Sequence, residues 1–157
     1  MATPRLQVLA LGLLTLSATA TLMAADPSGP MQPEDIKWGP PPPVLAAGAQ
    51  MAVLAGDPSQ SGPVTLRLKL PAGYKIAPHW HPTDERVTVI SGLFGLGMGD
   101  TLDKKKSKVL KPGGYAVAPA KMHHYAWTKS GAIVQVDLMG PFAITYVNSS
   151  DDPSKKN

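Results

Sequence analysis

The chain has 157 residues, enough for one domain with appendages, and a formal net charge of +4 that is too mild to indicate a nucleic-acid partner. It contains no cysteine, which excludes a disulfide scaffold, a thiolate nucleophile and cysteine-ligated zinc or iron–sulfur centres. Stability must therefore come from a packed core, supplemented by metal binding or oligomerisation.

Residues 1–25 have the composition of a secretory signal peptide. Arg5 is followed by an apolar stretch from Leu6 to about Leu16 and then by small residues. Ala18-Thr19-Ala20 and Ala24-Ala25 both fit the small-residue cleavage rule. An uncleaved membrane anchor is the alternative, but the apolar stretch is shorter than the roughly 20 residues that a span needs. We expect cleavage, no stable membrane span in the mature chain, and a periplasmic or secreted protein.

Residues 26–48 are dense in proline and predict an extended N-terminal arm. Proline lacks the amide donor that the interior of a sheet requires, so this segment should lie outside the sheets. Ile36 and Trp38 give the arm apolar side chains that can lie against a surface. A disordered linker and an arm exchanged between the subunits of a homodimer are both open alternatives.

Residues 49–148 predict short strands separated by Gly and Pro turns. Leu66, Leu68 and Leu70 alternate with polar residues, which is typical of a half-buried strand. The other expected strands are 52–54, 85–91, 93–98, 109–110, 115–118, 124–128, 132–139 and 142–147. Because no segment has helical periodicity, the pattern predicts an all-β antiparallel sandwich or barrel. The polar residues 149–157 should form a flexible tail.

Imidazole and carboxylate groups in the middle of the chain predict a metal site. His79 and His81 are two apart on an expected strand and therefore point to the same face. Glu85 can return to that face after a turn, and His124 can close the site from another strand. The alternatives are histidines without a metal, and a Glu85 that only hydrogen-bonds a ligating histidine. His123 should face away from the site, because it is adjacent to His124.

The run containing these ligands resembles the first motif of the cupin superfamily, at Gly73, His79, His81, Glu85 and Gly92. Its second motif is matched at Gly113, Pro119 and His124, while Lys121 and Thr128 stand where the family usually has glycine and often has asparagine. The chain looks most like small exported single-domain cupins and the ChrR-like cupin domains. The resemblance implies a jelly-roll barrel, a divalent metal held by three histidines and one glutamate, and frequent dimerisation.

Lys104, Lys105, Lys106, Lys108 and Lys111 form a basic cluster between two expected strands. A solvated loop is the default interpretation of such a cluster, and contact with a phosphate or an anionic surface is the alternative. Tyr115, Tyr125, Trp127 and Gln135 could line a pocket, although packing is the more common use of aromatic side chains.

Three functions compete for the predicted site. The first is a metal-dependent enzyme of dioxygenase type, using Fe, Mn or Ni on a small organic substrate with Glu85 as a catalytic base. Zn is the fourth candidate for the bound ion. The second is a non-enzymatic periplasmic protein that binds or senses a metal or small ligand. The third is a metal that only stabilises the barrel. The sequence shows no further acid or base aimed at the site, because Asp137 should point outward.

Overall fold

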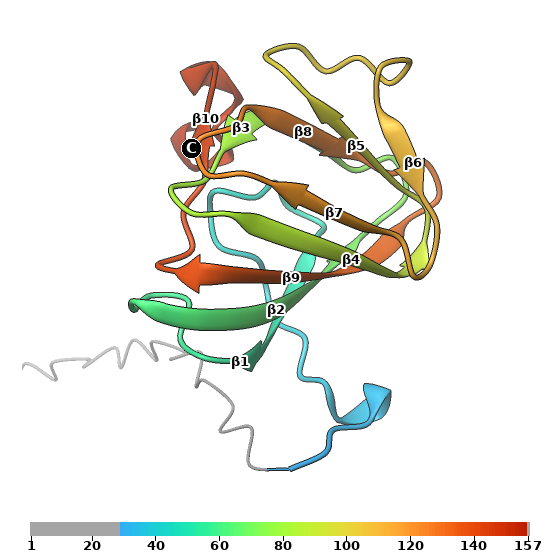
Figure 1. Ribbon diagram of the computed structural model, residues 1–157, viewed down its shortest axis with the longest axis vertical. Helices are drawn as coiled ribbons and strands as arrows, with labels where there is room; N and C mark the ends of the chain where they lie inside the picture. The colour runs from blue at the N-terminus through green and yellow to red at the C-terminus, as the bar shows by residue number, and fades with distance from the viewer. Residues whose placement is uncertain (1–28, 157) are drawn as a thin grey trace, which may run out of the picture.

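Two antiparallel sheets face each other in the computed structural model, which describes residues 29–156 (Figure 1). The first sheet has the order β1 (Gln50–Ala55), β2 (Gly62–Leu70), β9 (Ala132–Gly140), β4 (Glu85–Gly92) and β7 (Tyr115–Ala118). The second has the order β10 (Thr145–Tyr146), β3 (Lys75–Trp80), β8 (His124–Trp127), β5 (Phe94–Met98) and β6 (Lys108–Leu110). The predicted all-β antiparallel jelly roll is confirmed.

Helical structure in residues 29–156 is limited to short 3-10 helices. These are η1 (Pro33–Asp35), η2 (Ser149–Asp151) and η3 (Pro153–Lys155). None of the helices in this part of the chain has the length and apolarity needed to cross a membrane.

The core fills the space between the sheets with the aliphatic side chains of the alternating strands. Leu66 and Leu68 of β2 pair in register with Val136 and Val134 of β9, and all four are buried. Val87 of β4 continues the row on the other side of β9. Opposite residues of an antiparallel pair point to the same face, so the period-two pattern of each strand produces one apolar interior.

The arm packs on the barrel of its own chain. Gly39 and Met51 exchange two backbone hydrogen bonds of 2.9 Å, and Leu45 is buried in the core. Farther along, the hydroxyl groups of Tyr74 and Tyr146 donate to backbone carbonyls of residues 46 and 44, at 2.6 and 2.7 Å. The expected signal peptide lies outside the described residues.

The strand predicted over residues 142–147 is reduced to the two residues of β10. The preceding backbone groups are used elsewhere, because the Phe142 amide donates to the Pro58 carbonyl at 2.8 Å. The Ala143 carbonyl lies 2.7 Å from Nδ1 of His81. These groups are therefore unavailable for a ladder with β3, and one of them serves the candidate site.

Two glycines of β5 make room for the aromatic side chains of β8. Gly95 and Gly97 are directly opposite Trp127 and Tyr125 in the ladder. A Cβ atom on Gly97 would lie 2.2 Å from the Tyr125 ring, and one on Gly95 would lie 2.3 Å from the Trp127 indole. The rings thus cross the outer face of β5, where any larger residue would displace them.

The Gly97→Ala substitution should therefore destabilise the protein by about 1–3 kcal/mol, the usual cost of overpacking. Urea unfolding followed by circular dichroism measures the change. Gly29→Ala is the matched control, because no atom lies within 4 Å of a Cβ there. Equal unfolding free energies for the two variants would contradict the packing of Tyr125 on β5.

Candidate metal centre

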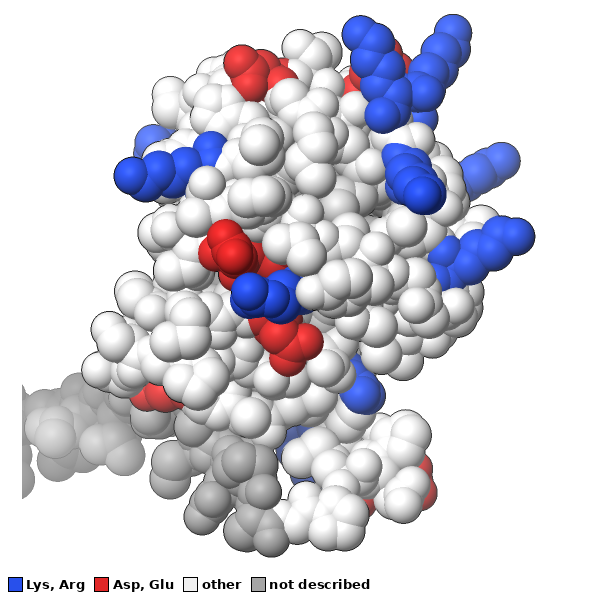
Figure 2. All heavy atoms as spheres, in the orientation of Figure 1, with Lys and Arg blue, Asp and Glu red and all other residues white. Residues whose placement is uncertain are grey.

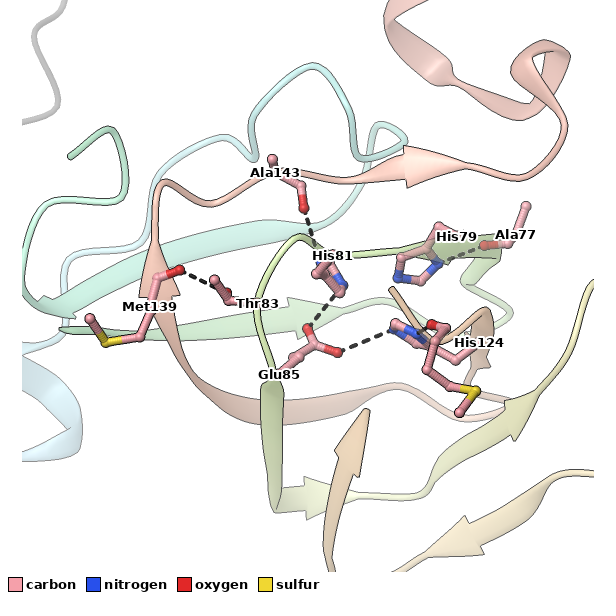
Figure 3. A network of polar contacts seen from close by, with 9 residues as sticks. Ala77, His79, His81, Thr83, Glu85, His124, Met139 and Ala143 are labelled. Atoms are coloured by element: carbon pink, nitrogen blue, oxygen red, sulfur yellow. Dashed lines mark hydrogen bonds and ion pairs between the residues drawn. The ribbon is translucent and has the colours of Figure 1, made fainter. Parts of the chain in front are cut away.

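Four side chains, from three strands and the turn after β3, meet inside the barrel between the two sheets (Figure 3). His79 belongs to β3 and pairs in register with His124, the first residue of β8. Glu85 is the first residue of β4, and His81 lies just beyond the end of β3. The three histidines are 1–3% exposed and Glu85 is 8% exposed. The structure thus brings all four predicted ligand residues together.

The turn between β3 and β4 is tied to the loop that precedes His124. The Lys121 amide donates to the His81 carbonyl at 2.8 Å, and the Ala120 amide donates to Asp84 Oδ1 at 2.9 Å. Lys121 has a φ of 61°, a left-handed conformation that favours glycine. Lysine at this motif position therefore keeps the loop shape that glycine would give, at some cost in backbone strain.

Each histidine is oriented by a backbone carbonyl. The Nδ1 atoms of His79 and His81 lie 2.7 Å from the carbonyl oxygens of Ala77 and Ala143, and Nδ1 of His124 lies 2.9 Å from that of Met122. A carbonyl oxygen can only accept, so each Nδ1 carries the proton. Each Nε2 of a neutral ring then presents a lone pair, as a metal ligand must.

These lone pairs converge. One ring nitrogen from each of His79, His81 and His124 can be chosen so that all lie within 4.8 Å of one another. Nε2 of His81 and Nε2 of His124 are buried and have no hydrogen-bond partner among the described residues. Buried polar atoms are rarely left unpaired, so a divalent cation between them is the group that the donor set fits.

Glu85 lies beside two of these nitrogens. Its Oε1 is 3.6 Å from His81 Nε2 and its Oε2 is 3.4 Å from His124 Nε2 (Figure 3). Burial raises the pKa of Glu85, but contact with His124 and attraction to the histidines outweigh it and lower the pKa to about 2. The carboxylate is therefore ionised at neutral pH and supplies negative charge next to the convergence point.

The pKa values of His79 and His124 shift in opposite directions. Burial, together with repulsion from His124 and His81, lowers the pKa of His79 to about 3. Burial also lowers the pKa of His124, but its contact with Glu85 outweighs this and raises it. His79 is thus neutral at neutral pH and ready to act as a ligand, whereas protons compete with a metal more strongly at His124.

The space next to the histidines is small. A cavity of about 20 Å³ is lined by His79, Glu85 and His124 and by apolar side chains that include Leu96 and Val136. This is room for about one water molecule. A larger ligand would have to approach from outside this cavity.

The other polar residues that the sequence suggested as candidates lie outside the donor set. His123 faces away and pairs with Asp100 on the surface, with 2.6 Å between Nδ1 and Oδ1. Asp137 lies on the outer face of its sheet, as predicted, and accepts from the Thr65 hydroxyl at 2.6 Å. Gln135 lies on the same outer face, with its Oε1 accepting from the Arg67 guanidinium at 3.3 Å.

Two aromatic rings near the histidines were not predicted. The Phe142 ring centre is 6.0 Å from that of His81, and the Tyr146 ring centre is 5.9 Å from that of His79. No local pattern identifies them, because only the pairing of β10 with β3 brings this late segment to the site. They supply apolar walls beside the donor set.

Comparison with known proteins identifies the family. The model of the family described as "Domain of unknown function (DUF4437)" matches residues 30–145, and the chain belongs to this family. A search of curated protein sequences finds no match.

Solved structures with the same architecture include an RmlC-like cupin from Shewanella frigidimarina NCIMB 400, with a TM-score of 0.55 and 16% identity over 69% of this chain and 87% of that one. The polyketide cyclase RemF from Streptomyces resistomycificus superimposes with a TM-score of 0.66 and 18% identity, over 81% of this chain and 90% of that one. A protein of Methylibium petroleiphilum PM1, provisionally named an acetylacetone dioxygenase, gives 0.60 and 18%, over 85% and 90%. The DMSP lyase DddQ from Ruegeria pomeroyi DSS-3 gives 0.57 and 18%, over 73% and 62%. The chain therefore has the cupin fold, with three histidines positioned to bind a metal.

Proposed function

We propose that this DUF4437 protein binds one divalent transition metal through His79, His81 and His124, with Glu85 as the fourth ligand, and acts on a small organic molecule. The convergence of buried Nε2 lone pairs that lack a protein partner carries this proposal. Nitrogen and carboxylate donors suit Fe, Mn, Ni and Zn.

A bound ion would supply a Lewis acid and, if redox-active, an electron-transfer centre. The protein holds the three imidazoles in one tautomer through the carbonyl contacts of Nδ1. The barrel interior excludes bulk water from the donor set, since the ligands are nearly fully buried. Glu85, with a pKa of about 2, is a weak base, which supports a role as ligand more than as the catalytic base.

Oxygen-dependent oxidation of a small substrate is the leading reaction class. The cupin fold carries a cyclase, a lyase and a provisionally named dioxygenase among the similar structures, and all three names denote small-molecule chemistry. At 18% identity, the substrates of these proteins cannot be assigned to this chain. Support for the reaction class therefore rests on the nitrogen and carboxylate donors of this chain.

Oxygen uptake tests the enzyme proposal. The protein is loaded anaerobically with Fe(II), Mn(II) or Ni(II), with Zn(II) as the redox-inactive control, mixed with short 1,3-diketones, 2-oxo acids or phenols, and transferred to an oxygen electrode. We expect uptake that requires both metal and substrate, that is lost in Glu85→Gln, and that persists in His123→Ala. A loaded protein whose electronic spectrum responds to these compounds without oxygen uptake would contradict the oxygenase proposal.

A second candidate, a non-enzymatic metal or small-ligand binder, is favoured by one observation. The cavity next to the histidines holds about one water molecule, so it leaves little room for a substrate beside a metal. Stoichiometric zinc in the purified protein and a spectrum that is silent toward oxygen would support this candidate over the enzyme.

We also propose that the protein is exported, because residues 1–25 have the composition of a signal peptide. The intact mass of the protein from the periplasm or culture medium tests this proposal. A mass that includes Met1 to Ala25 would contradict it.

A further inference from the structure

A groove of about 360 Å³ lies between β7 and the β5–β6 pair, outside the donor set. It is lined by Leu96, Met98 and Leu110, by Lys106 and Lys108, and by Tyr115 and Ala116. Tyr115 is 57% exposed and Met98 is 48% exposed, so the outer part of this β5–β7 groove faces solvent. Its inner end is Leu96, which also lines the cavity beside His124 and Glu85.

The groove exists because β7 presents only small side chains to the interior. Ala116 and Ala118 are opposite Val87 and Glu85 in the ladder with β4, so they share the inward face of these residues. Across the groove, Met98 is opposite His124 and therefore shares the face of this ligand. The groove thus begins at the surface and ends at Leu96, which it shares with the cavity beside the metal centre.

Two lysines give the groove a positive rim. Lys106 and Lys108 are exposed, and no carboxylate of residues 29–156 lies within 4.0 Å of either ammonium group. The nearby Asp103 carboxylate accepts from the Lys105 amide at 2.9 Å. Figure 2 shows Lys and Arg side chains standing out on the side where the β5–β6 loop and β6 lie in Figure 1.

The loop that carries Lys106 is anchored to the sheet. The Tyr125 hydroxyl donates to the Asp103 carbonyl at 2.7 Å, and Trp127 Nε1 donates to Ser107 Oγ at 2.8 Å. Lys104 adds a cation–π contact, with its Nζ 4.8 Å from the Trp127 ring centre. These are the rings that the glycines of β5 admit, so the loop is attached to β8 across β5.

We propose that the β5–β7 groove binds small organic anions, with the apolar body against Leu96, Met98 and Tyr115 and a carboxylate at Lys106 and Lys108. Pockets of about 300–1,000 Å³ that combine apolar walls with a few charged groups are typical small-molecule sites. That the groove also admits the anion to the metal rests on the function proposed above. Two lysines of the basic cluster, Lys106 and Lys108, then contact the ligand, while the rest of the cluster remains a solvated loop.

Amide NMR shifts of the metal-free protein test binding separately from the metal. 3-Phenylpropionate is titrated against its neutral analogue 3-phenylpropanol. We expect the acid to shift the amides of Gly97, Met98 and Ala116, and to bind more tightly than the alcohol. Shifts confined to other strands, equal affinity for acid and alcohol, or equal shifts with inorganic phosphate would overturn the proposed ligand class.

Charge-matched variants locate the carboxylate. The Lys106→Gln/Lys108→Gln protein should bind 3-phenylpropionate about three- to tenfold more weakly, the size expected for two exposed charge contacts. Lys105→Gln/Lys111→Gln removes the same charge from residues that do not line the groove and should leave affinity unchanged. Equal weakening in the two double variants would show that only net charge matters, and would contradict the proposed contact of the carboxylate with Lys106 and Lys108. Ala116→Leu, which fills the groove, should abolish binding while the amide spectrum stays dispersed.

The cobalt(II)-loaded protein tests whether the groove leads to the metal. Binding of 3-phenylpropionate should change its visible absorption spectrum, and Ala116→Leu should prevent the change. If cobalt binds and the spectrum does not respond, the groove is not the entrance. If the protein takes up no cobalt, the proposed function fails while the NMR result still decides the groove.

Discussion

The His81→Ala variant is expected to fold as a β protein and to lose stoichiometric metal binding. The substitution removes one of the converging Nε2 donors and leaves the other two without a third nitrogen. Loss of an outer partner of a ligand alone costs about 10- to 100-fold in affinity, so loss of the ligand itself should weaken binding at least about 100-fold. Competition titration with a chromophoric chelator measures the affinity.

His123→Ala provides the control, because this neighbour of a ligand is partly exposed and pairs with Asp100 outside the centre. It should bind metal as the unchanged protein does. Far-ultraviolet circular dichroism must show β structure in both variants. Equal metal affinity in His81→Ala and His123→Ala would contradict the assignment of the ligands.

Removal of the metal should lower the melting temperature by about 10 °C. A ligand bound only by the folded state adds about 2.7 kcal/mol when present at 100 times its dissociation constant, and each kcal/mol is worth several degrees in a domain of this size. The ligands come from β3, β4, β8 and the turn after β3, so the ion would join both sheets. Differential scanning calorimetry with and without a strong chelator measures the shift.

The His81→Ala protein separates this effect from any direct action of the chelator. It should melt at the same temperature with and without chelator, because it has no stoichiometric metal to lose. A chelator that removes the metal from the unchanged protein without altering its melt would show that binding and folding are not coupled.

The strands could be predicted from the sequence because their side chains alternate with period two. Leu66 and Leu68 illustrate this, since each is buried and Arg67 between them is not. The length of the last strand could not be predicted in this way. The shortening of β10 depends on the Ala143 carbonyl being 2.7 Å from His81, a contact between residues far apart in sequence.

The ligand residues could be named in advance because imidazoles two apart on a strand share a face. The carbonyl groups that orient these imidazoles could not be named in advance, because every residue has a backbone carbonyl and no sequence pattern marks the ones that are used. The glycines of β5 fall within the expected strand 93–98, and nothing in the sequence indicates their packing role. Their packing partners, Tyr125 and Trp127, follow from the pairing of β5 with β8. The homodimer stays a prediction, for which light scattering is the measurement.

Elemental analysis of the protein, purified without a metal-affinity tag, tests the central claim most directly. We predict about one equivalent of Fe, Mn, Ni or Zn per chain, either as purified or after reconstitution, and none in His81→Ala. A folded protein that takes up no divalent metal under any of these conditions would contradict the metal centre and the function proposed from it.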